Sequence, residues 1–320
     1  MSERLQKLMA RAGIESRRKI EAAITAGEIV LNGQVATLGD KANAGDRLRY
    51  AGKRYRVTES GARQARVIAY HKPEGRVTTR SDEHNRPTVF EHLPRLKQSR
   101  WVAIGRLDYN TTGLLLFTDN GDLANGLMHP SSEVEREYAC RVRGPVSEED
   151  LKKLTDGIEL EDGPARFQRC WFDGGTDNNQ WYRVVLSEGR NREVRRMWAT
   201  LGYQLSRLTR VRYGPIDLPG WLRAGKITDI EEGLLTHLYE TAGMSEKHAD
   251  AELRLVFDTV RRGRGPGNKR GRPNRANSGR GHSASTRARS ANARSESGGS
   301  QSGGAGKSTG MARGRKPGGR

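Results

Sequence analysis

A run of four large apolar residues, Leu114 to Phe117, constrains the fold of this chain more than any other stretch of its sequence. Polar segments that contain glycine bound the run on both sides, at residues 105–113 and 118–123. A short apolar run between turn signals is typical of a strand that is buried on both faces. The sequence therefore predicts a central strand of a sheet, preceded by a loop that brings polar side chains to the edge of the core.

The loop before this strand carries Asp108, two residues after Arg106. A guanidinium that lies close to a carboxylate favours its ionised form, because opposite charges attract. An ionised carboxylate at this position can act as a nucleophile or as a base. The alternative is that Asp108 and Asn110 only cap a turn through their side-chain oxygens, which is a common role of these residues in loops.

Three segments around Asp108 resemble the catalytic-aspartate motif of the pseudouridine synthases that modify ribosomal RNA. They are Gly-Arg-Leu-Asp at 105–108, Thr-x-Gly-Leu-Leu-Leu-Phe-Thr-Asp-Asn-Gly-Asp-Leu at 111–123, and Met-His-Pro at 128–130. The match is to the branch named for the small-subunit 16S rRNA enzyme, and the chain is most similar to 23S rRNA enzymes of that branch. The resemblance implies an α+β fold with a mainly antiparallel mixed sheet flanked by helices, and Asp108 as the catalytic nucleophile or base.

The resemblance also implies the reaction, which isomerises an RNA uridine to pseudouridine. The N1 glycosidic bond breaks, the uracil turns while it is held in the site, and its C5 then bonds to C1′. Arg106 would help to displace the uridine. Neither a metal nor a redox cofactor is implied, and the sequence contains neither a clustered His/Cys/Asp site nor a glycine motif that cradles phosphate.

Residues 133–142 alternate in a pattern that predicts a strand with Tyr138 on its more apolar face. A tyrosine in such a place most often packs in the core, with its hydroxyl satisfied locally. In the resembling family, however, a tyrosine at this place packs against the target base. The resemblance therefore implies that role for Tyr138.

A second motif, Glu-Gly-Arg-Asn-Arg-Glu-Val-Arg-Arg-Met-Trp at 188–198, predicts a turn at Gly189 followed by a helix with an apolar stripe. Arg195 lies beside that stripe, and a buried arginine requires an acidic partner. In the resembling family this helix supplies the arginine that pairs with the catalytic aspartate. By resemblance that residue is Arg195, and Arg192 and Arg196 would then face RNA.

The N-terminal residues predict two helices, at 3–12 and 17–26, followed by a hairpin with a turn at 32–33. Ser16 is the expected N-cap of the second helix. The first turn of that helix carries Arg17, Arg18 and Lys19, which oppose the helix dipole unless an anion such as phosphate lies among them. The alternative for each is a solvated surface position. Together these features resemble the S4 RNA-binding domain of a ribosomal protein and of many RNA enzymes.

The rest of the chain gives less specific expectations. We expect an interdomain linker at 58–66, a Lys-Pro turn in which Lys72 has an ordinary turn role, strands at 165–172 and 180–186 joined by a loop, and a helix at 228–242. Arg207, Arg210 and Arg212 alternate along one strand, either as RNA contacts or as a solvated face.

Charge is distributed unevenly along the 320 residues. Residues 1–60 hold 12 basic and 7 acidic side chains, residues 61–260 hold 29 and 30, and residues 261–320 hold 16 and 1. Two basic segments around a neutral middle suit a polyanion such as RNA. Because residues 261–320 contain no aromatic residue, Leu, Ile or Val, we expect a disordered tail that binds RNA through its charge.

Cys140 and Cys170, the two cysteines, are too few and too far apart for a zinc site or a disulfide framework. We assign them to packing and expect a reducing, cytoplasmic environment. No long apolar run, secretory signal or lipidation motif predicts a membrane. We expect a monomer.

The predicted organisation is an S4-like RNA-binding domain at 1–60, a pseudouridine synthase domain at 61–255 and a disordered Arg/Gly/Ser-rich tail at 256–320. The predicted function is isomerisation of a specific uridine in 23S ribosomal RNA, either free or in a pre-ribosomal particle. Two alternatives stay open, which are the same reaction on small-subunit rRNA and a non-catalytic RNA-binding factor for ribosome assembly. A purely binding protein would not need Asp108, Tyr138 and Arg195 together.

Overall fold

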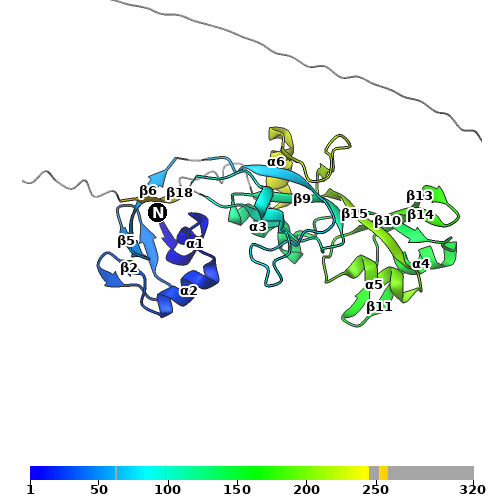
Figure 1. Cartoon of the computed structure of the whole chain (residues 1–320), viewed down its shortest axis with the longest axis horizontal. Helices are drawn as coiled ribbons and strands as arrows, with labels where there is room; N and C mark the ends of the chain where they lie inside the picture. The colour runs from blue at the N-terminus through cyan, green and yellow to red at the C-terminus, as the bar shows by residue number, and fades with distance from the viewer. Residues whose placement is uncertain (62, 98, 245–251, 259–320) are drawn as a thin grey trace, which may run out of the picture. The chain divides into compact units, whose positions relative to one another are not determined.

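The structure of the protein is a computed structural model that describes residues 1–61, 63–97, 99–244 and 252–258 (Figure 1). Its N-terminal module contains the helices α1 (Leu5–Arg11) and α2 (Arg17–Thr25). A small sheet pairs β1 (Ser2–Arg4) with β4 (Lys41–Asn43). A five-stranded antiparallel sheet follows the order β18-β6-β5-β2-β3, and these strands span Glu252–Phe257, Lys53–Ser60, Arg47–Tyr50, Val30–Leu31 and Gln34–Val35.

The N-terminal elements agree with their prediction except at two boundaries. Ser16 caps α2 by accepting a hydrogen bond from the Lys19 amide at 3.3 Å, as expected. The first helix was expected at 3–12, which is wrong at its start, because residues 2–4 pair with β4 as a strand. The linker expected at 58–66 also begins later, because β6 continues to residue 60.

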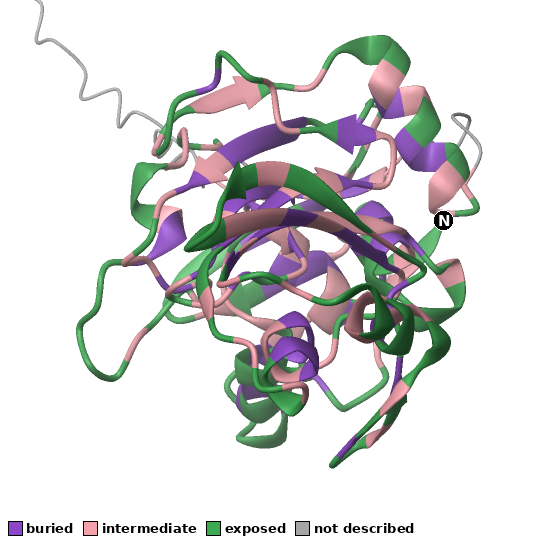
Figure 2. Cartoon of the chain, turned by 90° about the vertical axis from the view of Figure 1, so that its right-hand side faces the viewer, coloured by how far each residue is buried: buried purple, intermediate pink, exposed green. Residues whose placement is uncertain are grey.

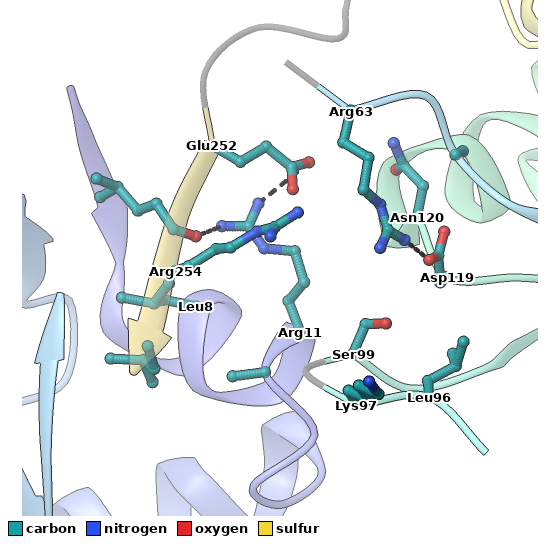
Figure 3. A pocket seen from close by; sticks show the side chains of 14 residues that line it. Leu8, Arg11, Arg63, Leu96, Lys97, Ser99, Asp119, Asn120, Glu252 and Arg254 are labelled. Carbon is teal, nitrogen blue, oxygen red and sulfur yellow. Dashed lines mark hydrogen bonds and ion pairs between the residues drawn. The ribbon is translucent and has the colours of Figure 1, made fainter. Parts of the chain in front are cut away.

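Strand β18 corrects the predicted domain boundaries. It pairs antiparallel with β6 over all 6 of its residues, and its Leu253 and Leu255 are buried in the same core as α1 and α2. Arg11 of α1 donates to the Leu253 carbonyl and forms an ion pair with Glu252 at 3.5 Å (Figure 3). Residues 252–257, which were expected in the synthase domain and the tail, therefore complete the N-terminal sheet. The tail from residue 259 onward lies outside the described residues.

The middle of the chain forms a nine-stranded sheet. Its main order is β13-β14-β10-β15-β9-β7-β17, while β16 pairs with β15 and β8 pairs with β9. In chain order these strands are β7 (Val67–Lys72), β8 (Val102–Ile104), β9 (Thr112–Thr118), β10 (Arg136–Arg143), β13 (Arg169–Thr176), β14 (Asn179–Leu186), β15 (Leu205–Tyr213), β16 (Ile216–Asp217) and β17 (Ile227–Asp229). Strands β15 and β9 run parallel, and the other paired strands of this sheet run antiparallel.

Helices flank this sheet, which confirms the expected α+β class. They are α3 (Gly121–Met128), α4 (Glu148–Asp156), α5 (Glu193–Thr200) and α6 (Glu232–Thr241), with short 3-10 helices at Val89–His92 and Pro130–Ser132. A separate hairpin joins β11 (Ile158–Leu160) to β12 (Gly163–Ala165). No helix among the described residues is long and apolar enough to cross a membrane.

Two predicted elements of this region differ from the structure. The helix expected at 228–242 is divided, because residues 227–229 pair with β7 as β17 and α6 begins only at Glu232. The loop expected at 173–179 is mostly strand, since β13 and β14 continue to a tight turn. A register shift between Phe172 and Gly175 accommodates the glycines that had indicated a loop.

Strand β9 is the central strand that the sequence predicted. Leu114 and Leu116 pack in one core, Leu115 and Phe117 pack in another, and all four are 0% exposed. The two cores lie on opposite faces of the sheet, since side chains alternate along a strand. Burial of both faces fixes the register of β9, and with it the position of the loop that carries Asp108.

Strands β9 and β15 approach closely at Gly113. This residue has a φ of +105°, and a Cβ there would lie 2.1 Å from the Arg210 carbonyl oxygen. The Arg210 side chain is 2% exposed, and its Nε donates to the Leu114 carbonyl at 2.7 Å. Neither of the two roles left open for Arg210 is therefore right, because this arginine is a core residue. Arg212 is also engaged within the protein, by Glu135 and Glu137 at 2.8 and 3.3 Å.

Lys72, the last residue of β7, forms hydrogen bonds to the loop that carries Asp108. Its side chain is fully buried, and its amine donates to the carbonyl oxygens of Tyr109 and Thr111 at 3.4 and 2.8 Å. Burial lowers the pKa of Lys72 to about 8, against an opposing effect of Asp108. Lys72 thus holds the backbone that follows Asp108, which is a more specific role than the expected turn chemistry.

The substitution Gly113→Ala should destabilise the protein. The new methyl group would overlap the Arg210 backbone, and a side chain is disfavoured at this positive φ. We expect the free energy of unfolding in urea to fall by about 3 kcal/mol or more. Gly121→Ala is the control, because a Cβ at Gly121 would meet nothing within 4 Å. Equal stability of the two variants would contradict the close approach of β9 and β15.

Lys72 should give the stability a defined pH dependence. Its pKa falls from 10.5 to about 8 on folding, so between these values only the unfolded chain binds the proton, and the free energy of unfolding rises with pH. The variant Lys72→Met lacks this effect. Relative to it, the wild type should gain about 3 kcal/mol in urea unfolding between pH 8 and pH 10.5. A difference that is independent of pH would show that the amine does not lose its proton in the fold.

Candidate active site

A cavity of about 460 Å³ lies around the loop that precedes β9. Asp108 is half-buried at its wall, and Arg106 is exposed beside it. Asn191, just before α5, contributes to the same wall. The structure therefore brings two of the predicted catalytic residues, Asp108 and Arg106, to one cavity.

Most of the remaining lining of the cavity comes from residues 77–86. Asp82 accepts hydrogen bonds from the side chain and the amide of Arg86, and these hold the pKa of Asp82 at about 2. The Arg86 guanidinium lies 5.9 Å from the centroid of the Tyr109 ring. Hydrogen bonds within this segment therefore hold its shape, and Arg86 contacts Tyr109, the residue after Asp108.

Helix α5 docks on the loop of Asp108 through two arginines. Nη2 of Arg195 donates to the Asn110 carbonyl at 2.8 Å, and Nη1 of Arg192 donates to the Asn110 side-chain oxygen at 3.5 Å. The helix is placed there because Met197 and Trp198 on its apolar face are fully buried against the sheet. Arg195 therefore contacts the loop at Asn110, two positions after Asp108 in the sequence. Arg192 contacts the same residue and is exposed.

The charge of Arg195 is incompletely satisfied in this arrangement. Its Nε is buried without a hydrogen-bond partner. Burial lowers the pKa of Arg195, Arg192 lowers it further, and Asp108 raises it. Within the described ranges Arg195 and Asp108 do not form an ion pair, so the expected pairing is not made in this structure.

Tyr138 lies on β10, in the row that it shares with Val184 of β14 and Arg210 of β15. It is half-buried and packs against both the core under α5 and the core that contains Phe117. Tyr138 does not belong to the wall of the cavity around Asp108. The structure therefore places it on the same face as α5 without joining it to Asp108.

The residues expected to contact RNA have different surroundings. Arg17, Arg18 and Lys19 are exposed in the first turn of α2, and Lys19 lies 3.4 Å from Glu15. Arg196, by contrast, binds both carboxylate oxygens of Asp162, at 2.8 and 2.9 Å. The expectation that Arg196 faces RNA thus needs correction, since its guanidinium already has a bidentate partner in the protein.

Three side chains around the site were missed or misjudged from the sequence. Lys72 and Arg210 are buried near the loop. Asn110 accepts hydrogen bonds from Arg192 and Arg195. The Lys-Pro turn was the available signal for Lys72, but a sequence pattern does not show which carbonyls an amine reaches. Among the described residues, no group of three or more His, Cys, Asp and Glu side chains could hold a metal ion.

Comparison with known proteins places this arrangement in a family. A family model described as RNA pseudouridylate synthase matches residues 66–200, and an S4 domain model matches residues 3–48. Ribosomal large subunit pseudouridine synthase B of Escherichia coli (strain K12) is 54% identical over 242 residues, which cover 75% of this chain and 83% of that protein. The protein of the same name from Salmonella typhi is 51% identical over 264 residues, which cover 82% and 90%.

A solved structure described as a pseudouridylate synthase is also similar. It has a TM-score of 0.51 and 26% sequence identity, and the match covers 73% of this chain and 99% of that chain. The matched range, residues 66–200, contains Asp108, Tyr138 and Arg195. From the identity to its relatives over most of its length, we conclude that the chain belongs to the RNA pseudouridylate synthase family and carries an S4 domain at its N-terminus.

Proposed function

We propose that this protein isomerises a specific uridine of large-subunit (23S) ribosomal RNA to pseudouridine, acting as a monomer in the cytoplasm. The observation that carries the proposal is the cavity of about 460 Å³ with Asp108 and Arg106 at its wall. A cavity of this size suits a ligand as small as a nucleotide. The choice of the large subunit rests on the names of the relatives, which are large-subunit enzymes.

Asp108 acts as the nucleophile or base that begins the isomerisation. Because its carboxylate lies inside a cavity of the protein, the target nucleotide has to leave its stack to reach it. Bases in RNA loops leave most easily, since they have fewer stacked and paired neighbours. Arg106, exposed beside Asp108, helps to displace the uridine.

Arg195 pairs with the Asp108 carboxylate when the substrate is bound. Its guanidinium already contacts the carbonyl of Asn110, and its buried Nε has no partner. An unsatisfied buried donor costs about 1–3 kcal/mol, which favours a small loop movement that brings the carboxylate to it. The ion pair expected between Arg195 and Asp108 is therefore proposed for the occupied site.

Tyr138 contacts the uracil, and the exposed basic side chains contact the RNA backbone. The first role rests on the family resemblance around Tyr138, which lies outside the cavity wall in this structure. The exposure of Arg17, Arg18, Lys19 and Arg192 supports the second. The S4 domain thereby contributes RNA affinity, while the cavity carries the chemistry.

The variant Asp108→Asn should abolish isomerisation and leave RNA affinity nearly unchanged, because the amide keeps the shape of the side chain without its charge. The measurement is tritium release from 5-tritiated uridine in large-subunit rRNA, with small-subunit rRNA as the comparison substrate. We expect release by the wild type from large-subunit rRNA alone. Substantial release by Asp108→Asn would remove Asp108 from the mechanism, and release from small-subunit rRNA would move the target.

The variant Arg195→Met should lose activity far more than RNA affinity. Without the guanidinium the Asp108 carboxylate lacks its proposed partner in the occupied site, so the chemical step should slow far more than binding weakens. Arg196→Met is the matched control, because Arg196 pairs with Asp162 at 2.8 Å. Its single-turnover rate at saturating RNA should stay close to the wild-type rate. If the two variants lose activity equally, or if Arg196 is the essential one, the proposed role of Arg195 is wrong.

A further inference from the structure

The large sheet has a second face on the side away from α5. Cys140, Tyr182 and Leu208 lie side by side on β10, β14 and β15 and pack into the core under α5. Because successive side chains of a strand point to opposite faces, their neighbours Arg141, Trp181 and Arg207 point away from α5.

These neighbours form a continuous row across three strands. Arg141 is the cross-strand partner of Trp181 on one side and of Arg207 on the other. Its guanidinium lies 5.9 Å from the centroid of the Trp181 ring. A register shift beside Arg141 marks a bulge between β10 and β15, a feature that often re-aims side chains at functional surfaces.

A second tryptophan lies on the same face in the neighbouring row, at the sheet edge. Strand β13 is exposed along most of its length (Figure 2). Trp171 on this strand is 38% exposed and stands opposite Arg183 of β14. A partly exposed aromatic ring at a sheet edge, beside arginines, offers a face on which a base can stack.

The arginines of this face divide into two groups. Arg169, Arg183 and Arg212 form ion pairs with Glu135, Glu137 or Asp173. Arg141 and Arg143 instead donate to Ser206 at 2.8 Å and to Gln204 at 3.5 Å, and Arg207 is exposed. Within the described ranges none of the last three has an acidic partner, so their positive charge is available to an anion.

We propose that Trp171, Trp181, Arg141, Arg143 and Arg207, here called the back-face surface, bind a single-stranded segment of RNA outside the catalytic cavity. Tryptophan faces stack on bases of any sequence, and unpaired arginines beside them bind phosphates, which is the combination that single-stranded RNA requires. An acidic peptide would use the arginines but would not need the two tryptophan rings. The back-face surface holds a segment of the substrate away from the uridine that enters the cavity.

The test measures the affinity of the full-length chain for a labelled uridine-rich RNA of about 12 nucleotides by fluorescence anisotropy, at several salt concentrations. Trp171→Ala should weaken binding on the order of tenfold, through the loss of one stacked base. Trp171→Phe should restore most of the affinity, because it keeps an aromatic face. Arg207→Gln should reduce the slope of log affinity against log salt by about 0.7, the value for one phosphate contact with a single strand.

Lys152→Gln is the matched control, because Lys152 is an exposed cation on α4, outside the back-face surface. The proposal is overturned if Trp171→Ala binds within twofold of the wild type, or if Lys152→Gln changes the salt slope as much as Arg207→Gln. Photo-crosslinking with 4-thiouridine RNA should label the peptides of β13 or β14, and labels confined to other segments would also overturn it. Since no readout involves isomerisation, failure here leaves the role of Asp108 untouched.

Discussion

The hydrogen bonds of a buried amine hold in place the loop that carries Asp108. Lys72 is fully buried at the end of β7, and its amine fixes the carbonyls of Tyr109 and Thr111 directly after Asp108. Burying an ammonium group costs free energy, and for this reason burial lowers the pKa of Lys72. The hydrogen bonds of the amine to the two carbonyls offset part of this cost, and they give the loop a defined position beside the cavity. Strand β9, buried on both faces, extends that order into the core.

The site is built from two halves of one sheet that meet where β9 and β15 run parallel. One half supplies the Asp108 loop, and the other supplies Arg192 and Arg195, which both contact Asn110. Gly113 lets the two strands approach, and Arg210 joins them by donating to the Leu114 carbonyl. Arg195 crosses the same junction to Asn110 and retains an unsatisfied Nε. The halves are therefore in contact before substrate arrives, while the proposed ion pair is left to form with it.

The sequence predicted those features that depend on local pattern. The apolar run at Leu114–Phe117, the capped helix α2 and the α+β class all follow from periodicity, capping residues and turn signals. Features that depend on distant partners were not predictable in this way. Strand β18 was missed because its partner β6 lies about two hundred residues earlier in the chain. Arg210 was misjudged because only the packing of β15 against β9 shows which arginine of the strand is buried. Arg196 was assigned to RNA because nothing in the sequence shows that Asp162 lies next to it in the fold.

A protein that acts as proposed makes one pseudouridine in large-subunit ribosomal RNA and needs Asp108 to make it. The most direct measurement maps pseudouridines in both ribosomal RNAs of a host strain that lacks the gene, complemented with either the wild type or Asp108→Asn. The account predicts that one large-subunit pseudouridine is absent from the deletion strain, returns with the wild type and stays absent with Asp108→Asn. Loss of a small-subunit pseudouridine instead, no loss at all, or recovery with Asp108→Asn would contradict it.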